Sequence, residues 1–138
     1  MSFYRKGKQA ELELVKKLRK AGYAVMRAPA SGAKAKRVFY PDVFAVKFDG
    51  KNYRVLVFEV KLRKHRDTIH IAGPKIWLLQ DYARRAGGKA YVAVKISEEK
   101  QWYVFPVEEL QEQKYEKGVR YVITKDMFSR ARRLSEVV

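Results

Sequence analysis

The feature that most restricts the fold of this chain is a pair of apolar stretches around Asp49 and Gly50. The first reads DVFAVKF and the second reads YRVLVFEVKL. Apolar runs on both sides of an Asp-Gly pair are typical of a β-hairpin. Charged residues stand at unexpected places in this hairpin: Asp42 opens the first stretch, and Glu59 and Lys61 lie inside the most apolar run of the second. The fold must therefore place two carboxylates and an amine where apolar side chains would stabilise a sheet better.

The remaining patterns predict one α/β domain, residues 1–138, with a central mixed sheet flanked by helices. Residues 4–21 have a helical pattern that Gly22 ends, and Pro74 can begin a second helix that Gly87 ends. Strands are predicted at 23–28, 90–96, 102–107 and 120–124, and basic loops at 31–38 and 63–73. The rest is a short acidic segment at 108–113 and a basic helix at 125–134, capped by Thr124.

Net charge is the strongest signal in the composition. The 138 residues hold 31 Lys and Arg against 15 Asp and Glu, a formal charge of +16. Such a surplus indicates a polyanionic partner, above all nucleic acid, although a solubility charge or an anionic membrane would also use it. The absence of cysteine excludes disulfides and thiolate chemistry. Without an apolar run that could span a bilayer and without a signal peptide, we expect a soluble intracellular protein that uses no membrane.

Strand alternation brings the charged residues of the hairpin together. Glu59 and Lys61 share one face of their strand with Val57. A two-residue turn at 49–50 would place Asp42 opposite Val57, on that same face and one diagonal step from Glu59. A four-residue turn keeps this parity, whereas a three-residue turn with a bulge breaks it.

A further carboxylate comes from the first helix. Glu11 falls on the apolar stripe of Leu14, Val15 and Leu18, while Leu12 points elsewhere. Each acid alone has an ordinary structural explanation, such as an ion pair with a core arginine. Three carboxylates in one place repel one another and need a cation, for which Mg²⁺ is the usual choice. A lysine beside them can stabilise charge on a phosphate, so the pattern indicates cleavage of a nucleic-acid phosphodiester.

Pro41 and Asp42, followed after sixteen residues by Glu59, Val60 and Lys61, resemble the PD-(D/E)xK nuclease motif. Over residues 4–108 the chain also resembles the archaeal Holliday junction resolvases. The matching segments are YRKGKQAELELVKKLRKAGYAVMRAPASG, FEVK, ARRAGGKAYVAVKI and WYVFPV. The resemblance implies a restriction-endonuclease-like α-β-β-β-α-β core. Two departures are Leu12, where some members carry arginine, and a longer loop before Asp42.

The resemblance implies a homodimeric endodeoxyribonuclease that nicks opposed strands of a four-way junction in DNA recombination and repair. Its site would consist of Glu11, Asp42, Glu59, Lys61 and, as in some members, Ser31. The three acids would hold Mg²⁺, or Mn²⁺ in its place, with no other small-molecule cofactor, and Lys61 would stabilise the transition state. We expect the protein in the cytoplasm, associated with the nucleoid. The residues predicted to contact DNA are Arg5, Lys6, Arg27, Lys34, Lys36, Arg37, Arg63, Lys64, Arg66 and Lys75.

Two alternatives remain open at this point. One is another PD-(D/E)xK repair nuclease, and the other is a junction-binding architectural protein whose acids are structural. Metal-dependent nicking would separate both nucleases from the architectural protein. Apolar residues available for a dimer interface are Ile76, Trp77, Trp102, Tyr103 and Phe105, and we expect at least half of these to belong to the core instead.

Overall fold

A computed structural model describes residues 3–29 and 38–138. Its centre is a five-stranded mixed sheet in the order β1-β2-β3-β5-β6, in which β3 and β5 run parallel and the other neighbours run antiparallel. The strands are β1 (Ala24–Arg27), β2 (Val43–Phe48), β3 (Tyr53–Arg63), β5 (Lys89–Ile96) and β6 (Gln101–Pro106). The charged strand β3 is therefore the middle strand and is paired along both of its edges.

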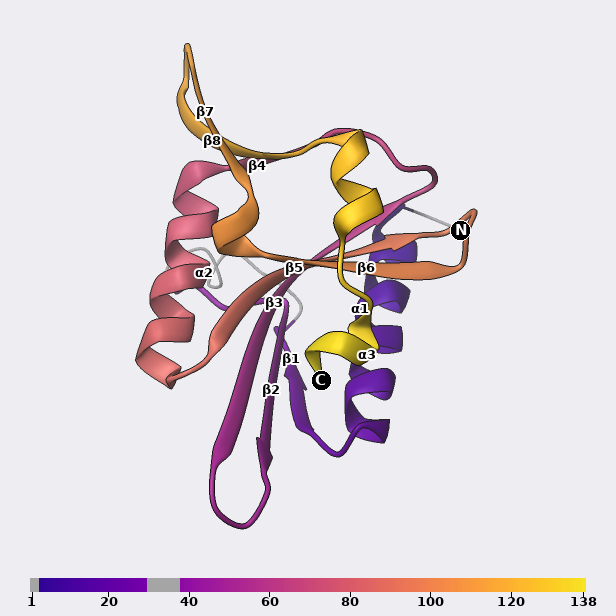
Figure 1. Ribbon diagram of the computed structural model, residues 1–138, viewed down its shortest axis with the longest axis vertical. Coiled ribbons are helices and arrows are strands. Elements are labelled where there is room, and N and C mark those ends of the chain that lie inside the picture. The colour runs from indigo at the N-terminus through magenta and orange to yellow at the C-terminus, as the bar shows by residue number, and fades with distance from the viewer. Residues whose placement is uncertain (1–2, 30–37) are drawn as a thin grey trace.

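One helix covers each face of this sheet (Figure 1). On one face, α1 (Phe3–Lys20) packs Leu14 and Leu18, both fully buried, against a cluster that includes Phe58. On the other, α2 (Gly73–Ala86) packs Ile76 and Leu79 against a cluster that includes Val57. The predicted central mixed sheet flanked by helices is confirmed. Within the described residues, no helix is long and apolar enough to cross a membrane.

The hairpin forms as predicted, but its turn has four residues and not two. Phe48 pairs with Tyr53, so residues 49–52 make the turn. The Asp49 carboxylate accepts the backbone N–H groups of Lys51 and Asn52 at 2.9 and 2.7 Å, and Gly50 adopts a φ of +94°. These bonds favour the longer turn because the aspartate side chain replaces a backbone acceptor. Asp42 stays on the predicted face of the sheet. However, Val43 pairs with Phe58, so Asp42 lies beside Glu59, whereas we expected it opposite Val57.

A second, three-stranded sheet was not predicted. It consists of β4 (Ile69–Ala72), β8 (Gly118–Ile123) and β7 (Gln111–Tyr115), in the order β4-β8-β7. The predicted loop at 63–73 is thus partly wrong, because β3 continues to Arg63 and Ile69 and Ile71 are buried on one face of β4. The predicted acidic segment is likewise divided between a 3₁₀ turn (η2, Val107–Glu109) and β7.

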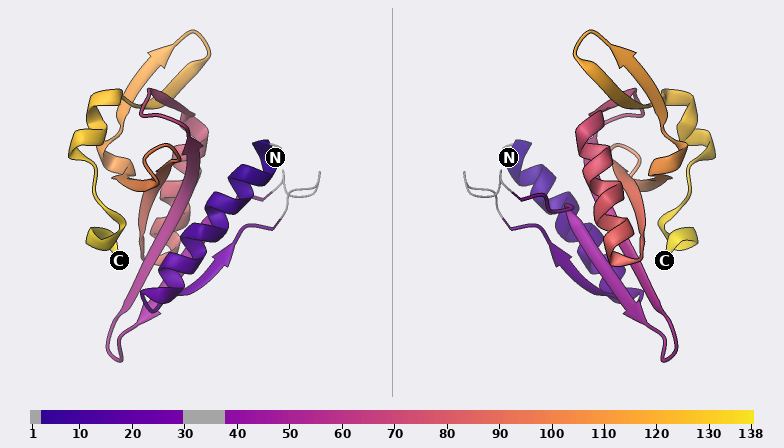
Figure 2. Two further views of the ribbon diagram at one scale, coloured as in Figure 1. Left: turned by 90° about the vertical axis from the view of Figure 1, so that its right-hand side faces the viewer. Right: turned by 90° about the vertical axis from the view of Figure 1, so that its left-hand side faces the viewer.

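The C-terminal segment does not form the single basic helix that we predicted. It contains a 3₁₀ helix (η3, Lys125–Arg130) and a short α3 (Leu134–Val137). Between them, the backbone of Arg132 exchanges two hydrogen bonds with Val104 of β6, at 2.9 and 3.1 Å. This bridge holds the chain in an extended conformation that a continuous helix would not allow. Figure 2 shows the segment running beside the sheet toward the C-terminus.

The expectation that most candidate interface residues belong to the core is confirmed. Ile76, Trp102, Tyr103 and Phe105 are all at most 5% exposed. Only Trp77 of that set is exposed, at 47%, and it lies on the outer side of α2 beside Leu78, which is 48% exposed. Pro74 and Gly87 delimit α2 as predicted, the latter with a left-handed φ of +70°.

Candidate active site

Glu59 is the only charged residue in the buried class among the residues that the structure describes. Its side chain is 3% exposed, and its Oε2 atom lies 3.2 Å from Lys61 Nζ and 2.8 Å from Lys75 Nζ. Lys61 follows it by two residues on β3 and shares its face, as strand alternation predicts. Lys75 comes from the first turn of α2. Two cations thus neutralise one buried carboxylate, and their attraction offsets the desolvation penalty of burying its charge.

Asp42 lies immediately before β2 and contacts Glu59. Its Oδ2 atom accepts the backbone N–H of Val60 at 2.8 Å, and its carboxyl group lies close enough to that of Glu59 for the two to interact electrostatically. Burial and the negative charge of Glu59 together raise the pKa of Asp42 from 3.8 to about 7, against the lowering effect of the Val60 N–H. The two acids therefore form a close pair that would gain from a shared cation.

Glu11 stands apart from this pair. The buried centre of α1 is formed by Ala10, Leu14 and Leu18, and Glu11 lies at its margin, not in the middle of the stripe as predicted. Its Oε1 atom accepts a hydrogen bond from Arg27 Nη1 at 3.0 Å, and both side chains are 22–23% exposed. Glu11 still contributes, after burial and Glu59, to raising the pKa of Asp42. It therefore faces the acid pair from α1 without touching it.

The donor atoms suit a hard divalent cation. No group of three or more His, Cys, Asp or Glu side chains within the described part of the chain is arranged to hold a metal. The structure thus brings together two of the three predicted ligands, Asp42 and Glu59. Mg²⁺ is commonly held by one or two carboxylates with substrate phosphate and water completing its shell. The carboxylate oxygens of the buried Glu59 and of Asp42, whose pKa burial and Glu59 raise, fit such an ion.

The predicted DNA contacts fall into three groups. Arg5 and Lys6 on α1 and Lys64 after β3 are exposed. Four others already have protein partners: Arg27 binds Glu11, Lys75 binds Glu59, Arg63 donates to the Leu62 carbonyl at 2.8 Å, and Arg66 binds Glu99 and the Tyr103 hydroxyl. The last group comprises Lys34, Lys36 and Arg37, which lie outside the described residues, as does Ser31, which was predicted as a residue of the catalytic site.

The contact between Lys75 and Glu59 was missed by the sequence analysis, which placed Lys75 among the phosphate contacts. Pro74 was the available signal, because it fixes Lys75 in the first turn of a helix that follows β3. The distance of sixteen residues between Glu59 and Lys75 carries no periodicity that would pair them.

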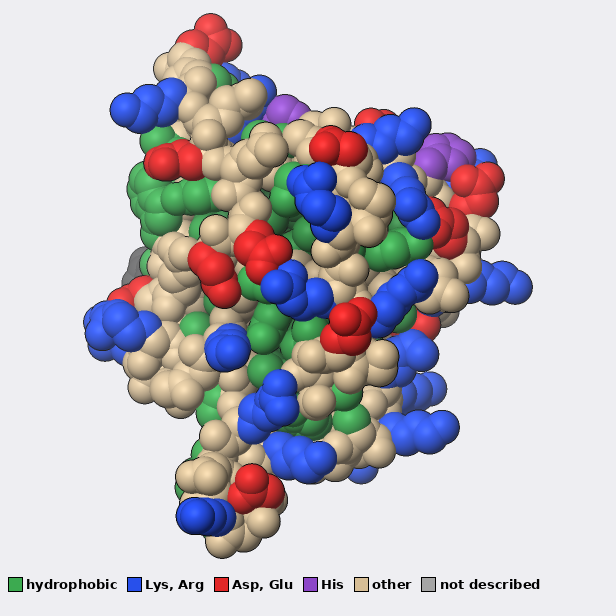
Figure 3. All heavy atoms as spheres, viewed as in Figure 1, with side chains coloured by type: hydrophobic (Ala, Val, Ile, Leu, Met, Phe, Trp, Pro, Cys, Tyr) green, Lys and Arg blue, Asp and Glu red, His purple; other side chains and the backbone are tan. Residues whose placement is uncertain are grey.

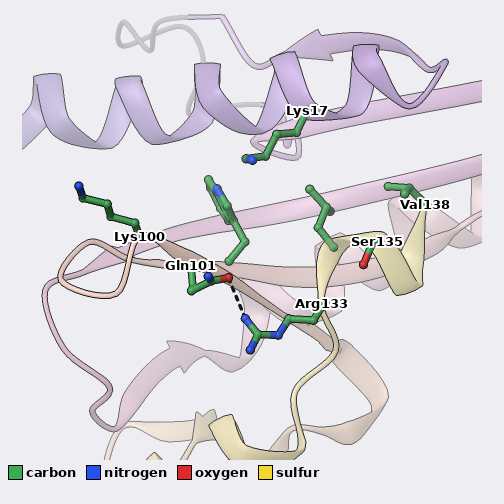
Figure 4. A pocket seen from close by; sticks show the side chains of 8 residues that line it. Lys17, Lys100, Gln101, Arg133, Ser135 and Val138 are labelled. Carbon is green, nitrogen blue, oxygen red and sulfur yellow. Dashed lines mark hydrogen bonds between the residues drawn. The ribbon is translucent and has the colours of Figure 1, made fainter.

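Basic side chains also gather away from the acids. Lys and Arg line the side of the molecule formed by α1 (Figure 3). There, α1, the start of β6 and the C-terminal segment surround a hollow of about 500 Å³, lined by Lys17, Lys100, Gln101, Trp102, Arg133, Leu134, Ser135 and Val138. Arg133 Nη1 donates to Gln101 Oε1 at 2.8 Å (Figure 4). This lining has three cationic side chains and none of the site acids, so the hollow is separate from the acid pair.

The raised pKa of Asp42 predicts an unusual pH dependence of stability. A carboxyl group whose folded pKa lies near 7 binds its proton more tightly in the folded state than in the unfolded state. Its contribution is therefore fully present below about pH 4 and is lost as the pH rises through 7. We expect the free energy of unfolding of the metal-free protein to be roughly 2 to 4 kcal/mol higher at pH 5 than at pH 8. Its melting temperature should be higher at pH 5 accordingly.

Asp42→Asn is the control for this measurement, because it removes the titrating group and keeps the side-chain size. Thermal unfolding in EDTA should show a flatter pH dependence for this variant between pH 5 and 8. An identical slope for the wild type and the variant would assign the pH dependence to other groups. The acids with lowered pKa values, such as Glu99 and Asp81, lose their stabilisation only at lower pH.

Known proteins resemble this chain in sequence and in fold. The family model described as archaeal Holliday junction resolvase (Hjc) matches residues 2–138. The crossover junction endodeoxyribonuclease Hjc of Sulfurisphaera tokodaii is 36% identical over 91 residues, which are 66% of this chain and 60% of that protein. Its namesake from Archaeoglobus fulgidus is 35% identical over 106 residues, 77% of this chain and 72% of that protein. The match thus spans less than two thirds of the first relative's length.

The three-dimensional comparison extends over nearly the whole chain. The crystal structure of Archaeoglobus fulgidus Hjc, a Holliday junction resolvase, superposes with a TM-score of 0.74 at 29% identity, covering 96% of this chain and 94% of that one. The α/β architecture is accordingly restriction-endonuclease-like, as the sequence implied. With a family model that matches residues 2–138, the chain belongs to the archaeal Holliday junction resolvase family.

Proposed function

We propose that this protein is a Mg²⁺-dependent endodeoxyribonuclease that resolves four-way DNA junctions by nicking two opposed strands. The observation that carries the proposal is the pairing of Asp42 with the buried Glu59, with Lys61 alongside, in a chain of net charge +16. Family membership supports the junction as substrate, since the relatives are named crossover junction endodeoxyribonucleases. The nucleoid of the cytoplasm is the proposed location, because that is where such junctions arise.

Asp42 and Glu59 would hold the metal through their carboxylate oxygens. Bound Mg²⁺ supplies positive charge that a phosphoryl oxygen and an attacking water both require. Lys61, held against Glu59, would place its ammonium group beside the charge that builds on the phosphate. Glu11, across from the pair on α1, would orient water or a second cation. Water oxygen bonds to phosphorus, the bond to the 3′ oxygen breaks, and that oxygen takes a proton, giving a 5′-phosphate and a 3′-hydroxyl.

Junction binding would depend on exposed cations, among them Arg5, Lys6 and Lys64. We further propose a homodimer, because a junction offers two equivalent scissile phosphates and a twofold dimer presents two equivalent sites. Trp77 and Leu78, both about half exposed on α2, supply apolar surface for such an interface. A fully active monomer in sedimentation at micromolar concentration would overturn this part.

Cleavage of a mobile four-way junction, compared with linear, flap and Y-shaped DNA of the same sequences, tests the proposal. We expect paired nicks in the junction with Mg²⁺ or Mn²⁺, no nicks in EDTA, and junction binding under both conditions. Preferred cutting of the flap or Y substrate would instead indicate another PD-(D/E)xK repair nuclease. Binding without cleavage under every metal condition would indicate an architectural protein.

A further inference from the structure

Lys75 occupies a position that helix stability disfavours. It is in the first turn of α2, after Pro74, where the helix dipole places positive partial charge. No acidic residue lies in this turn, and the cap residue Ala72 offers no side-chain hydrogen bond. A lysine here adds charge of the same sign as the free N–H groups, and a carboxylate would stabilise the helix better. Its placement therefore calls for a reason outside the helix.

That reason is the buried carboxylate of Glu59. Lys75 Nζ lies 2.8 Å from Glu59 Oε2, which is closer than Lys61 Nζ at 3.2 Å, and both amines use the same oxygen. The Lys75 side chain is 45% exposed while that of Glu59 is 3% exposed, so Lys75 reaches from the surface into the site. Burial alone would lower the pKa of Lys75, but the charges of Glu59, Asp42 and Glu11 outweigh it and raise the pKa.

We propose that Lys75 is a positioning residue that fills the cation position on Glu59 until a metal ion takes its place. The inference rests on the proposed function, because it assumes that Glu59 is a metal ligand. A metal ion and an ammonium group cannot both neutralise the same carboxylate fully, since the two cations repel each other. Metal loading therefore requires Lys75 to release Glu59. Its partly exposed amine is then available to a phosphate of the DNA.

The first test measures Mn²⁺ affinity without DNA, by electron paramagnetic resonance of the free ion, in the wild type and in Lys75→Met. We expect the variant to bind Mn²⁺ about tenfold more tightly, which corresponds to about 1.4 kcal/mol, because the competing cation is gone. Lys75→Arg keeps the charge and should retain an affinity near that of the wild type. Lys51→Met is the matched control, since this exposed lysine of the hairpin turn makes no ion pair with Glu59 among those that the structure describes. Unchanged or weaker binding by Lys75→Met would overturn the proposal.

The second test uses the unaltered protein, so it does not depend on how a variant folds. Amine acylation followed by mass spectrometry gives the labelling rate of Lys75 with and without Mg²⁺. Release from Glu59 should raise this rate several-fold on addition of Mg²⁺, whereas Lys64 should show no change. An equal rate at Lys75 under both conditions would contradict the displacement.

Metal-dependent cleavage and the role of Lys75 can be tested separately. If the wild type binds no Mn²⁺ at all, the metal-dependent function fails and the role of Lys75 fails with it. If the wild type binds Mn²⁺ and cleaves the junction, but Lys75→Met has the same Mn²⁺ affinity, only the role of Lys75 is wrong. Reduced junction affinity at unchanged Mn²⁺ affinity would then assign Lys75 to phosphate contact alone.

Discussion

Replacing Glu59 with glutamine is expected to slow single-turnover cleavage of a four-way junction by about 10³-fold or more, because it removes the most buried oxygen donor of the site. Junction affinity should stay the same or rise slightly. Removing a negative charge from a protein of net charge +16 does not weaken its attraction to phosphates. Quenched-flow cleavage and a gel-shift titration on one preparation measure both quantities.

Glutamine keeps one oxygen that the two lysine ammonium groups can contact, but it leaves Lys61 and Lys75 without their counter-charge. We therefore expect some loss of stability in the metal-free protein, and circular dichroism must establish that the variant is folded before its rate is interpreted. Glu98→Gln is a suitable control, since Glu98 is exposed and pairs with His65 far from the acid pair in sequence. Normal cleavage by folded Glu59→Gln would remove Glu59 from the site, and lost junction binding would make its role structural.

Glu11→Gln is expected to reduce cleavage by about 10²-fold or more while changing the melting temperature little. The ion pair between Glu11 and Arg27 is partly exposed, at 22–23% for the two side chains, and such pairs contribute at most about 1 kcal/mol. A role in orienting water or a second cation requires a carboxylate, which the amide cannot replace. The melting temperature and the single-turnover rate of one purified variant give the answer.

Arg27→Gln breaks the same ion pair and leaves the carboxylate of Glu11 in place. If Glu11 acts in catalysis, the Arg27 variant should retain much more of the cleavage rate than the Glu11 variant at saturating junction. Equal losses of stability in both variants, with normal cleavage by Glu11→Gln, would reduce Glu11 to the structural partner of Arg27. The sequence had left that alternative open, and the observed ion pair makes the comparison necessary.

Features that depend on neighbouring residues were predictable from the sequence. The hairpin, the two main helices and the shared face of Glu59 and Lys61 follow from periodicity and from turn residues. The number of residues in the turn was not predictable, because the Asp49 side chain supplies acceptors that compete with a tighter turn. Both turn lengths keep Asp42 on the same face of the sheet. The predicted turn therefore gave the correct face for Asp42 but the wrong cross-strand neighbour, Val57 in place of Glu59.

Features that depend on distant segments were not predictable. The strand at Ile69–Ala72 exists because β8, some fifty residues later, supplies its hydrogen-bonding partner. The C-terminal helix is interrupted because Arg132 pairs with Val104. Likewise, helix periodicity and the family resemblance together assigned Glu11 to the metal site, and only the tertiary position of Arg27 on β1 shows which residue is its immediate partner. Tertiary contacts of this kind override local preference.

The central position of β3 has a consequence for heat inactivation. Its residues 56–58 pair with both β2 and β5, and residues 59–63 continue the pairing with β5, in a sheet that is covered on both faces. Backbone groups enclosed in this way exchange with solvent chiefly when the whole domain opens, unlike those of fraying ends or loops. The strand that carries Glu59 and Lys61 therefore remains formed for as long as the molecule is folded. Irreversible loss of activity on heating should follow global unfolding and not precede it through local melting of the site.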